Sequence, residues 1–154
     1  MTIYDRIREA GITLPTLAIP VAAFRPYVLF NNQLIVSGQL PVRDGKAMFT
    51  GKVPDVRSVS DAQGAARLCV INILAWAHHA TQGNLNRIGQ VLRLGGFVAT
   101  SEGFADAPVV VNAASELVTQ IFGERGSHAR IAIGVASLPL NASVEVEATF
   151  ALEG

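Results

Sequence analysis

Apolar residues recur every three or four positions between residues 60 and 81, which places them on one face of an α-helix. They are Ala62, Ala65, Ala66, Cys69, Val70, Ile73, Leu74 and Ala77. Ser60 and Gln63 fit a capping box at the start of this stretch, and Gly83 follows its end. The pattern predicts a long helix over residues 60–81.

A second apolar stripe lies between residues 107 and 122, and it consists of Val110, Val111, Ala114, Leu117, Val118 and Ile121. Asp106 suits an N-cap, Pro108 an early-turn position, and Gly123 a helix stop. These signals predict a second helix over 107–122. A short helix is expected over 3–10.

Five runs have the composition or the alternation of β-strands. They cover residues 21–30, 34–37, 88–100, 130–136 and 143–152. Asn31 and Asn32 favour a tight turn between the first two runs, which therefore form a hairpin. The adjacent Gly95 and Gly96 suggest either a bulge or a close backbone approach, and residues 41–53 are expected to be a loop, with or without a short strand.

The elements follow the order ββαβαββ, which predicts a single α+β domain spanning residues 1–154. Two helices can cover one face of a mixed sheet. The other face is left without helices, and we expect a partner surface there.

The composition supports this expectation. Half of the 154 residues are hydrophobic, 16% are charged, and mean hydropathy is +0.37. So few charges suit a chain that buries a face in a homo-oligomer. Twelve basic residues balance twelve acidic ones, which argues against disorder and disfavours nucleic acid as a partner.

No membrane span or targeting signal is expected. The longest apolar stretch, residues 68–80, is too short for a span and contains Asn72, His78 and His79. Residues 1–10 carry four charges and no apolar region typical of a signal peptide, so we expect a cytoplasmic protein. Cys69 lies among apolar neighbours and is interpreted as a packed thiol.

Motifs for phosphate loops, dinucleotides, zinc pairs and nucleophile elbows are absent, so neither a cofactor nor a metal is predicted. His78 and His79 are adjacent on a helix and project about 100° apart, which disfavours a shared metal ion.

Arg130 begins a predicted strand whose same-side neighbours Ala132, Gly134 and Ala136 are small. Two interpretations remain open: an anchor that grips a ligand carboxylate with two parallel hydrogen bonds, or a structural ion pair. His128 shares that face if the strand extends to it, and is otherwise a partly exposed strand-entry residue.

Glu145 and Glu147 lie on the less apolar face of the last strand. They are either a solvated sheet edge, or one of them reaches the Arg130 pocket to position a water molecule or move a proton.

An ordered set of short motifs resembles the Rid/YjgF family, in particular its longer YjgF-like, "endoribonuclease L-PSP" subgroup. The motifs are Val36-Ser37-Gly38-Gln39-Leu40-Pro41, Asp44-Gly45, Asn112, His128-Ala129-Arg130, Leu138-Pro139 and Val144-Glu145-Val146-Glu147. Arg130 stands nine positions before Pro139 and Glu145 six after it, which is the family's spacing of its carboxylate-binding arginine and its water-positioning glutamate.

The resemblance implies a chorismate-mutase-like fold and a homotrimer whose sheets face a central barrel, with pockets between neighbouring subunits. It implies a deaminase that hydrolyses reactive enamine or imine intermediates, such as 2-aminoacrylate, to 2-oxo acids and ammonia. Two alternatives are a non-catalytic binder of small carboxylates and the ribonuclease suggested by the family's name. Zero net charge disfavours the ribonuclease.

The resemblance also assigns roles. Arg130 would hold the substrate carboxylate and Glu145 would orient water. The residues that would contact the substrate or shape the pocket are Ser37, Gly38, Asn112, Ala132, Phe24 and His128. Phe24 stands where many of these deaminases carry a tyrosine, and Ala132 stands where a cysteine is frequent.

Overall fold

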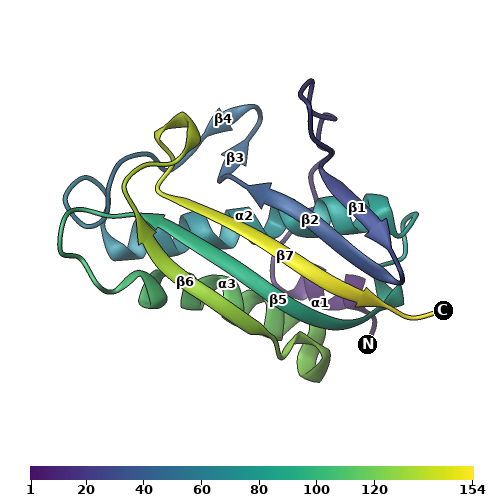
Figure 1. The fold of residues 1–154 in the computed structure, drawn as a ribbon. Coiled ribbons are helices and arrows are strands. Elements are labelled where there is room, and N and C mark those ends of the chain that lie inside the picture. Colours follow the sequence, from purple (N-terminus) through teal and green to yellow (C-terminus); the bar gives the residue numbers. More distant parts are fainter.

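A computed structural model describes all residues from Met1 to Gly154 (Figure 1). Its α-helices are α1 (Ile3–Glu9), α2 (Val59–Ala80) and α3 (Ala107–Phe122), and its short 3-10 helices are η1 (Leu85–Arg87), η2 (Gly123–Gly126) and η3 (Pro139–Asn141). Its strands are β1 (Tyr27–Phe30), β2 (Gln33–Gln39), β3 (Val42–Arg43), β4 (Lys46–Ala47), β5 (Ile88–Ala99), β6 (Ala129–Val135) and β7 (Val144–Leu152).

The main sheet has five strands in the order β1-β2-β7-β5-β6. Strands β5 and β6 are parallel because α3 connects them, and every other neighbouring pair is antiparallel. The predicted α+β class with a mixed sheet is confirmed. A separate hairpin, β3–β4, turns at Asp44 and Gly45 within the predicted loop.

Helices α2 and α3 lie on the same face of the sheet, and both chain termini lie at one end of it (Figure 1). Alternate residues of β7 point toward the helices and are buried: Val144, Val146, Ala148 and Phe150. They join a single hydrophobic core of 33 buried residues that includes both helical stripes. No helix combines the length and apolar character needed to cross a bilayer.

The other face of the sheet carries no helix, as predicted. Ile35, Ile131 and Ile133 project from it and remain 39–46% exposed. An exposed row of isoleucines on an uncovered sheet is typical of an interaction surface. We call this side the open face and the other side the helix face.

Two strand boundaries differ from the prediction. The strand predicted over 21–30 is paired only from Tyr27, because Pro26 has no N–H for the ladder and the chain bends before it. Its partner extends beyond residue 37 to Gln39, with an irregular register between Val36 and Gln39.

The helix starts and the glycine pair also differ in detail. Helix α2 is capped by the Ser58 hydroxyl, which accepts the Asp61 N–H at 3.0 Å, so the predicted Ser60 box is not used. Asp106 occupies the N-cap of α3 without a side-chain hydrogen bond. The register of β5 is regular at Gly96, and the glycine instead permits close packing, because a Cβ there would lie 2.5 Å from Val111 Cγ1.

Candidate functional site

Arg130 points from β6 toward α3 on the helix face. Its Nη2 donates to Asn112 Oδ1 at 2.8 Å and to the Pro108 carbonyl at 3.4 Å, and its Nη1 donates to Ser115 Oγ at 3.2 Å. Pro108, Asn112 and Ser115 follow one another at helical spacings of four and three, so one stripe of α3 supplies all three acceptors.

The guanidinium has no acidic partner. The four ion pairs of the chain join Arg8 to Asp5, Arg57 to Asp61, Arg93 to Glu147 and Arg125 to Glu153, and none involves Arg130. Every acceptor around Arg130 is neutral, and Arg130 itself is exposed. Three of the five guanidinium N–H groups donate to these acceptors, so the positive charge and the other two donors are available to a ligand. Within the chain, this excludes the structural ion pair.

His128 lies just before β6, half-buried between η2 and α3. Its Nδ1 contacts the Gly126 carbonyl at 2.6 Å and its Nε2 contacts Ser115 Oγ at 2.8 Å. His128 therefore joins Arg130 through the serine hydroxyl rather than by sharing a strand face. We call Arg130, Asn112, Ser115 and His128 the arginine cluster.

Ala132 follows Arg130 on the helix face and is half-buried against the core beside Gly96. Its small side chain leaves the α3 stripe open to Arg130.

Glu145 lies on β7 opposite Phe97 of β5, which in turn lies opposite Ile133 of β6. Paired residues share a face, so Glu145 is on the open face. Gly38 of β2 provides the space for its carboxylate, because a Cβ on Gly38 would collide with Glu145 Oε2 and lie 3.0 Å from Cδ.

The environment of Glu145 makes its carboxyl group a weaker acid than an ordinary glutamate. Partial burial raises the pKa of Glu145, and repulsion from the Glu147 carboxylate raises it further. Glu147 itself is paired with Arg93 at 2.8 Å. A partly buried carboxyl group with a raised pKa is suited to exchanging a proton with water.

The structure does not bring Arg130 and Glu145 together within one chain. Arg130 is level with Leu94 and Ala148, three residues along β7 from Glu145. The two positions are thus roughly 10 Å apart along the strand direction and roughly 10 Å apart across two strand spacings, and they face opposite ways.

Two other predicted residues lie near Gly38. The Ser37 hydroxyl donates to the Arg25 carbonyl at 2.6 Å, and so fixes the segment that enters β1. Phe24, in that segment, is 58% exposed and lines a cavity of about 970 Å³ together with Gly38.

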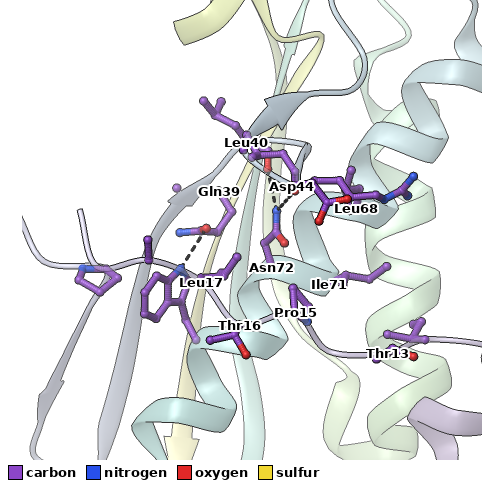
Figure 2. Close-up of a pocket in the computed structure, with 18 of the residues that line it drawn as sticks. Thr13, Pro15, Thr16, Leu17, Gln39, Leu40, Asp44, Leu68, Ile71 and Asn72 are labelled. Carbon is purple, nitrogen blue, oxygen red and sulfur yellow. Dashed lines mark hydrogen bonds between the residues drawn. The ribbon is translucent and has the colours of Figure 1, made fainter. Parts of the chain in front are cut away.

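This cavity lies between the N-terminal segment, the end of β2 and helix α2 (Figure 2). Asn72 is at its wall and donates through Nδ2 to the carbonyls of Leu40 and Val42, while its buried Oδ1 has no hydrogen-bond partner. Trp76 donates to Gln39 Oε1 at 3.2 Å, which fixes the strand end that follows Gly38.

The remaining candidates have structural surroundings. His78 Nδ1 contacts the Tyr4 hydroxyl at 2.9 Å and His79 Nδ1 contacts the Tyr27 hydroxyl at 2.7 Å, so each bonds a different tyrosine. Cys69 is fully buried, and burial raises the pKa of its thiol, in agreement with a packed, unreactive cysteine. No group of three or more His, Cys, Asp or Glu side chains is arranged to hold a metal ion.

Sequence reasoning missed Ser115 and the carbonyls of Pro108 and Gly126. The three-residue spacing of Asn112 and Ser115 was a usable signal, since it places two polar side chains on the same side of the predicted helix. The two backbone carbonyls could not be predicted from the sequence, because every residue has a carbonyl group.

The chain is similar to known proteins in both sequence and structure. Protein TCP17 of Trypanosoma cruzi is 41% identical over 143 residues, which cover 92% of this chain and 89% of that protein. The crystal structure of Atu1372, a protein of unknown function from Agrobacterium tumefaciens, is 44% identical with a TM-score of 0.92, covering 99% of this chain and 94% of the other. That of a "putative endoribonuclease" from Shewanella oneidensis is 33% identical with a TM-score of 0.94, covering 99% and 100%.

Residues 4–151 match the protein family described as "YjgF/chorismate_mutase-like, putative endoribonuclease". This range contains both the arginine cluster and Glu145. The fold, the similar structures and the family match agree, and the chain belongs to the YjgF/chorismate mutase-like, or Rid, family.

Proposed function

We propose that the protein is a deaminase of reactive 2-imino acids and their enamine tautomers, with Arg130 as the carboxylate anchor. The observation that carries the proposal is the guanidinium of Arg130, held by three neutral acceptors and paired with no acid. A planar, fixed guanidinium with free donors is the group best suited to a small carboxylate.

The reaction needs little more than positioning. Water adds its oxygen to the imine carbon, the carbon–nitrogen bond breaks, and ammonia leaves with protons from the water, so that a 2-oxo acid remains. Because an imine carbon is already electrophilic, an oriented and polarised water suffices. In this proposal Glu145 orients that water, and its raised pKa suits it to pass a proton to the departing nitrogen.

One chain does not supply both groups to one site. The proposal therefore includes a homotrimer in which Arg130 of one subunit meets Glu145 of a neighbour. Gly38 is beside the glutamate, and Ser37 and Phe24 are close to Gly38. The open face with its exposed isoleucines supports such an assembly. Asn112, Ala132 and His128 accompany Arg130.

The test measures how fast 2-aminoacrylate, released by a β-eliminating enzyme, becomes pyruvate, with lactate dehydrogenase as the reporter. Wild-type protein is expected to exceed the spontaneous rate, and Arg130→Ala and Glu145→Gln are expected to lose the acceleration. Arg8→Ala removes an exposed arginine on α1 and serves as the matched control. A wild-type rate equal to the spontaneous rate refutes the deaminase.

The same arginine cluster supports a second function, a non-catalytic binder of 2-oxo acids, since the cluster is complete in one chain while Glu145 is remote. Calorimetry with pyruvate distinguishes the two. Binding that Arg130→Ala abolishes, without any turnover, favours the binder over the deaminase.

A further inference from the structure

His128, Ser115 and Arg130 form a continuous hydrogen-bonded chain. His128 Nδ1 is 2.6 Å from the Gly126 carbonyl, His128 Nε2 is 2.8 Å from Ser115 Oγ, and Ser115 Oγ is 3.2 Å from Arg130 Nη1. Three backbone segments meet here: η2, the entry to β6, and α3.

The chemistry of the groups determines which partner donates in each of these hydrogen bonds. A carbonyl oxygen only accepts, so His128 Nδ1 carries the proton that is donated to Gly126. In the neutral ring Nε2 is then an acceptor and receives the Ser115 hydroxyl proton. Ser115 Oγ is left with lone pairs for Arg130 Nη1, and the hydroxyl proton does not compete with the guanidinium.

The direction of these hydrogen bonds matters because an arginine side chain without fixed partners is mobile. An exposed arginine has many rotamers, and one hydrogen bond fixes a point rather than a plane. Asn112 binds Nη2 and Ser115 binds Nη1, so together they define the plane of the guanidinium. A serine hydroxyl rotates freely unless a second group binds it, and His128 is that group.

We propose that Ser115 and His128 are positioning residues that set the orientation of Arg130 for two-point binding of a carboxylate. Neither needs to touch the substrate. The inference rests on the proposed role of Arg130 as carboxylate anchor, but the hydrogen-bonded chain is testable without any ligand.

The first test is nuclear magnetic resonance on the ligand-free protein. We expect His128 to be protonated on Nδ1 and unprotonated on Nε2, and the Arg130 Nη groups to give separate signals because their rotation is slowed. Ser115→Ala is expected to merge those signals, whereas Ser115→Thr, which keeps the hydroxyl, preserves them. A His128 ring protonated on Nε2 alone, or Arg130 signals unchanged in Ser115→Ala, overturns the proposal.

The second test uses 2-aminoacrylate turnover. Ser115→Ala and His128→Phe are expected to raise KM about tenfold with kcat changed less than about twofold, which corresponds to the loss of one hydrogen bond to a charged group. Ser115→Thr restores the KM. Thr119→Ala removes the hydroxyl one turn along α3, which contacts only the Ser115 carbonyl, and is expected to keep the wild-type KM.

The two tests separate this proposal from the deaminase itself. A wild-type protein without turnover refutes the deaminase, and the resonance measurements still decide the hydrogen-bonded chain. Active wild-type protein with an unchanged KM in Ser115→Ala refutes the positioning role alone. A merely structural role for Ser115 would lower the amount of folded enzyme, and hence kcat, without changing KM.

Discussion

Two inactive variants are expected to regain activity when their chains are mixed. Arg130 lies on the helix face and Glu145 on the open face of the same sheet, so a shared site takes one group from each of two chains. An Arg130→Ala chain still offers its Glu145, and a Glu145→Gln chain still offers its Arg130. Each variant alone is inactive, but a mixed assembly contains some complete sites.

The expected activity follows from counting. In assemblies formed at random from equal amounts, the subunit that supplies the arginine is intact in half of the sites, and so is the neighbour that supplies the glutamate. About a quarter of the sites are then complete, whatever the number of subunits in a closed ring. The mixture should therefore reach about 25% of the wild-type rate.

A double variant gives an independent check with a different expectation. Chains with both substitutions, mixed equally with wild-type chains, also leave about a quarter of shared sites complete. If one chain supplied both groups, about half of the sites would be complete, and the two single variants would not complement each other.

The assay unfolds and refolds the mixed chains and follows 2-aminoacrylate turnover, with native mass spectrometry on differently tagged chains to prove that hybrids form. Arg130→Ala mixed with wild type is the control and should retain about half of the activity. Hybrid assemblies that stay inactive would refute the shared site.

Four further results follow from the structure. Gly38→Ala is expected to displace the Glu145 carboxylate and lower kcat about 100-fold, measured by turnover, while thermal unfolding changes little because the collision is with a flexible side chain. Glu145→Gln is expected to raise the melting temperature at about pH 8 and not at about pH 3.5. Because the pKa of Glu145 is raised, the folded state binds the proton more tightly than the unfolded state, and the free energy of unfolding falls as pH rises through the pKa of the folded state. Glutamine does not ionise and so removes this loss. Gly96→Ala is expected to lower the free energy of urea unfolding by about 1–3 kcal/mol, since its Cβ would press on Val111. Ile133→Glu is expected to reduce the assembly to smaller species in sedimentation, and an unchanged mass would show that the open face is not an interface.

The helices and the layer arrangement were predictable because each depends on local periodicity. The stripe that includes Cys69 and Leu74 has the helical period, and the alternation in β7 assigns Val146 and Phe150 to the core. The helix-free face was predictable because two helices are enough to cover only one of the two faces of the sheet. These features need no knowledge of which strands are neighbours.

Boundaries and caps were less predictable because they depend on competition between similar groups. Ser58 and Ser60 are both plausible caps, and the backbone of Ser58 has the extended conformation that a cap requires. Likewise, the apolar run begins at residue 21, but the pairing of β1 starts only at Tyr27, directly after Pro26.

The arginine cluster shows the limit of single-strand patterns. The small residues after Arg130 indicate that its side of β6 has room, but they do not indicate which element lies over it. That element is α3, which brings Asn112 and Ser115 within hydrogen-bond distance of the guanidinium. The sequence therefore singles out Arg130 as a candidate, but of the side chains that bind its guanidinium it indicates Asn112 and not Ser115.

The separation of Arg130 from Glu145 is a consequence of register. Arg130 is paired through Leu94 with Ala148, and Glu145 is three positions from Ala148 on β7. Because this separation is odd, strand alternation places the Arg130 and Glu145 side chains on opposite faces of the sheet. Moving Glu145 to the side of Arg130 would require a one-residue slip of β7, which would expose Phe150 and place the carboxylate in the core. The core therefore holds the two groups apart in each chain, and a common site requires contact between chains.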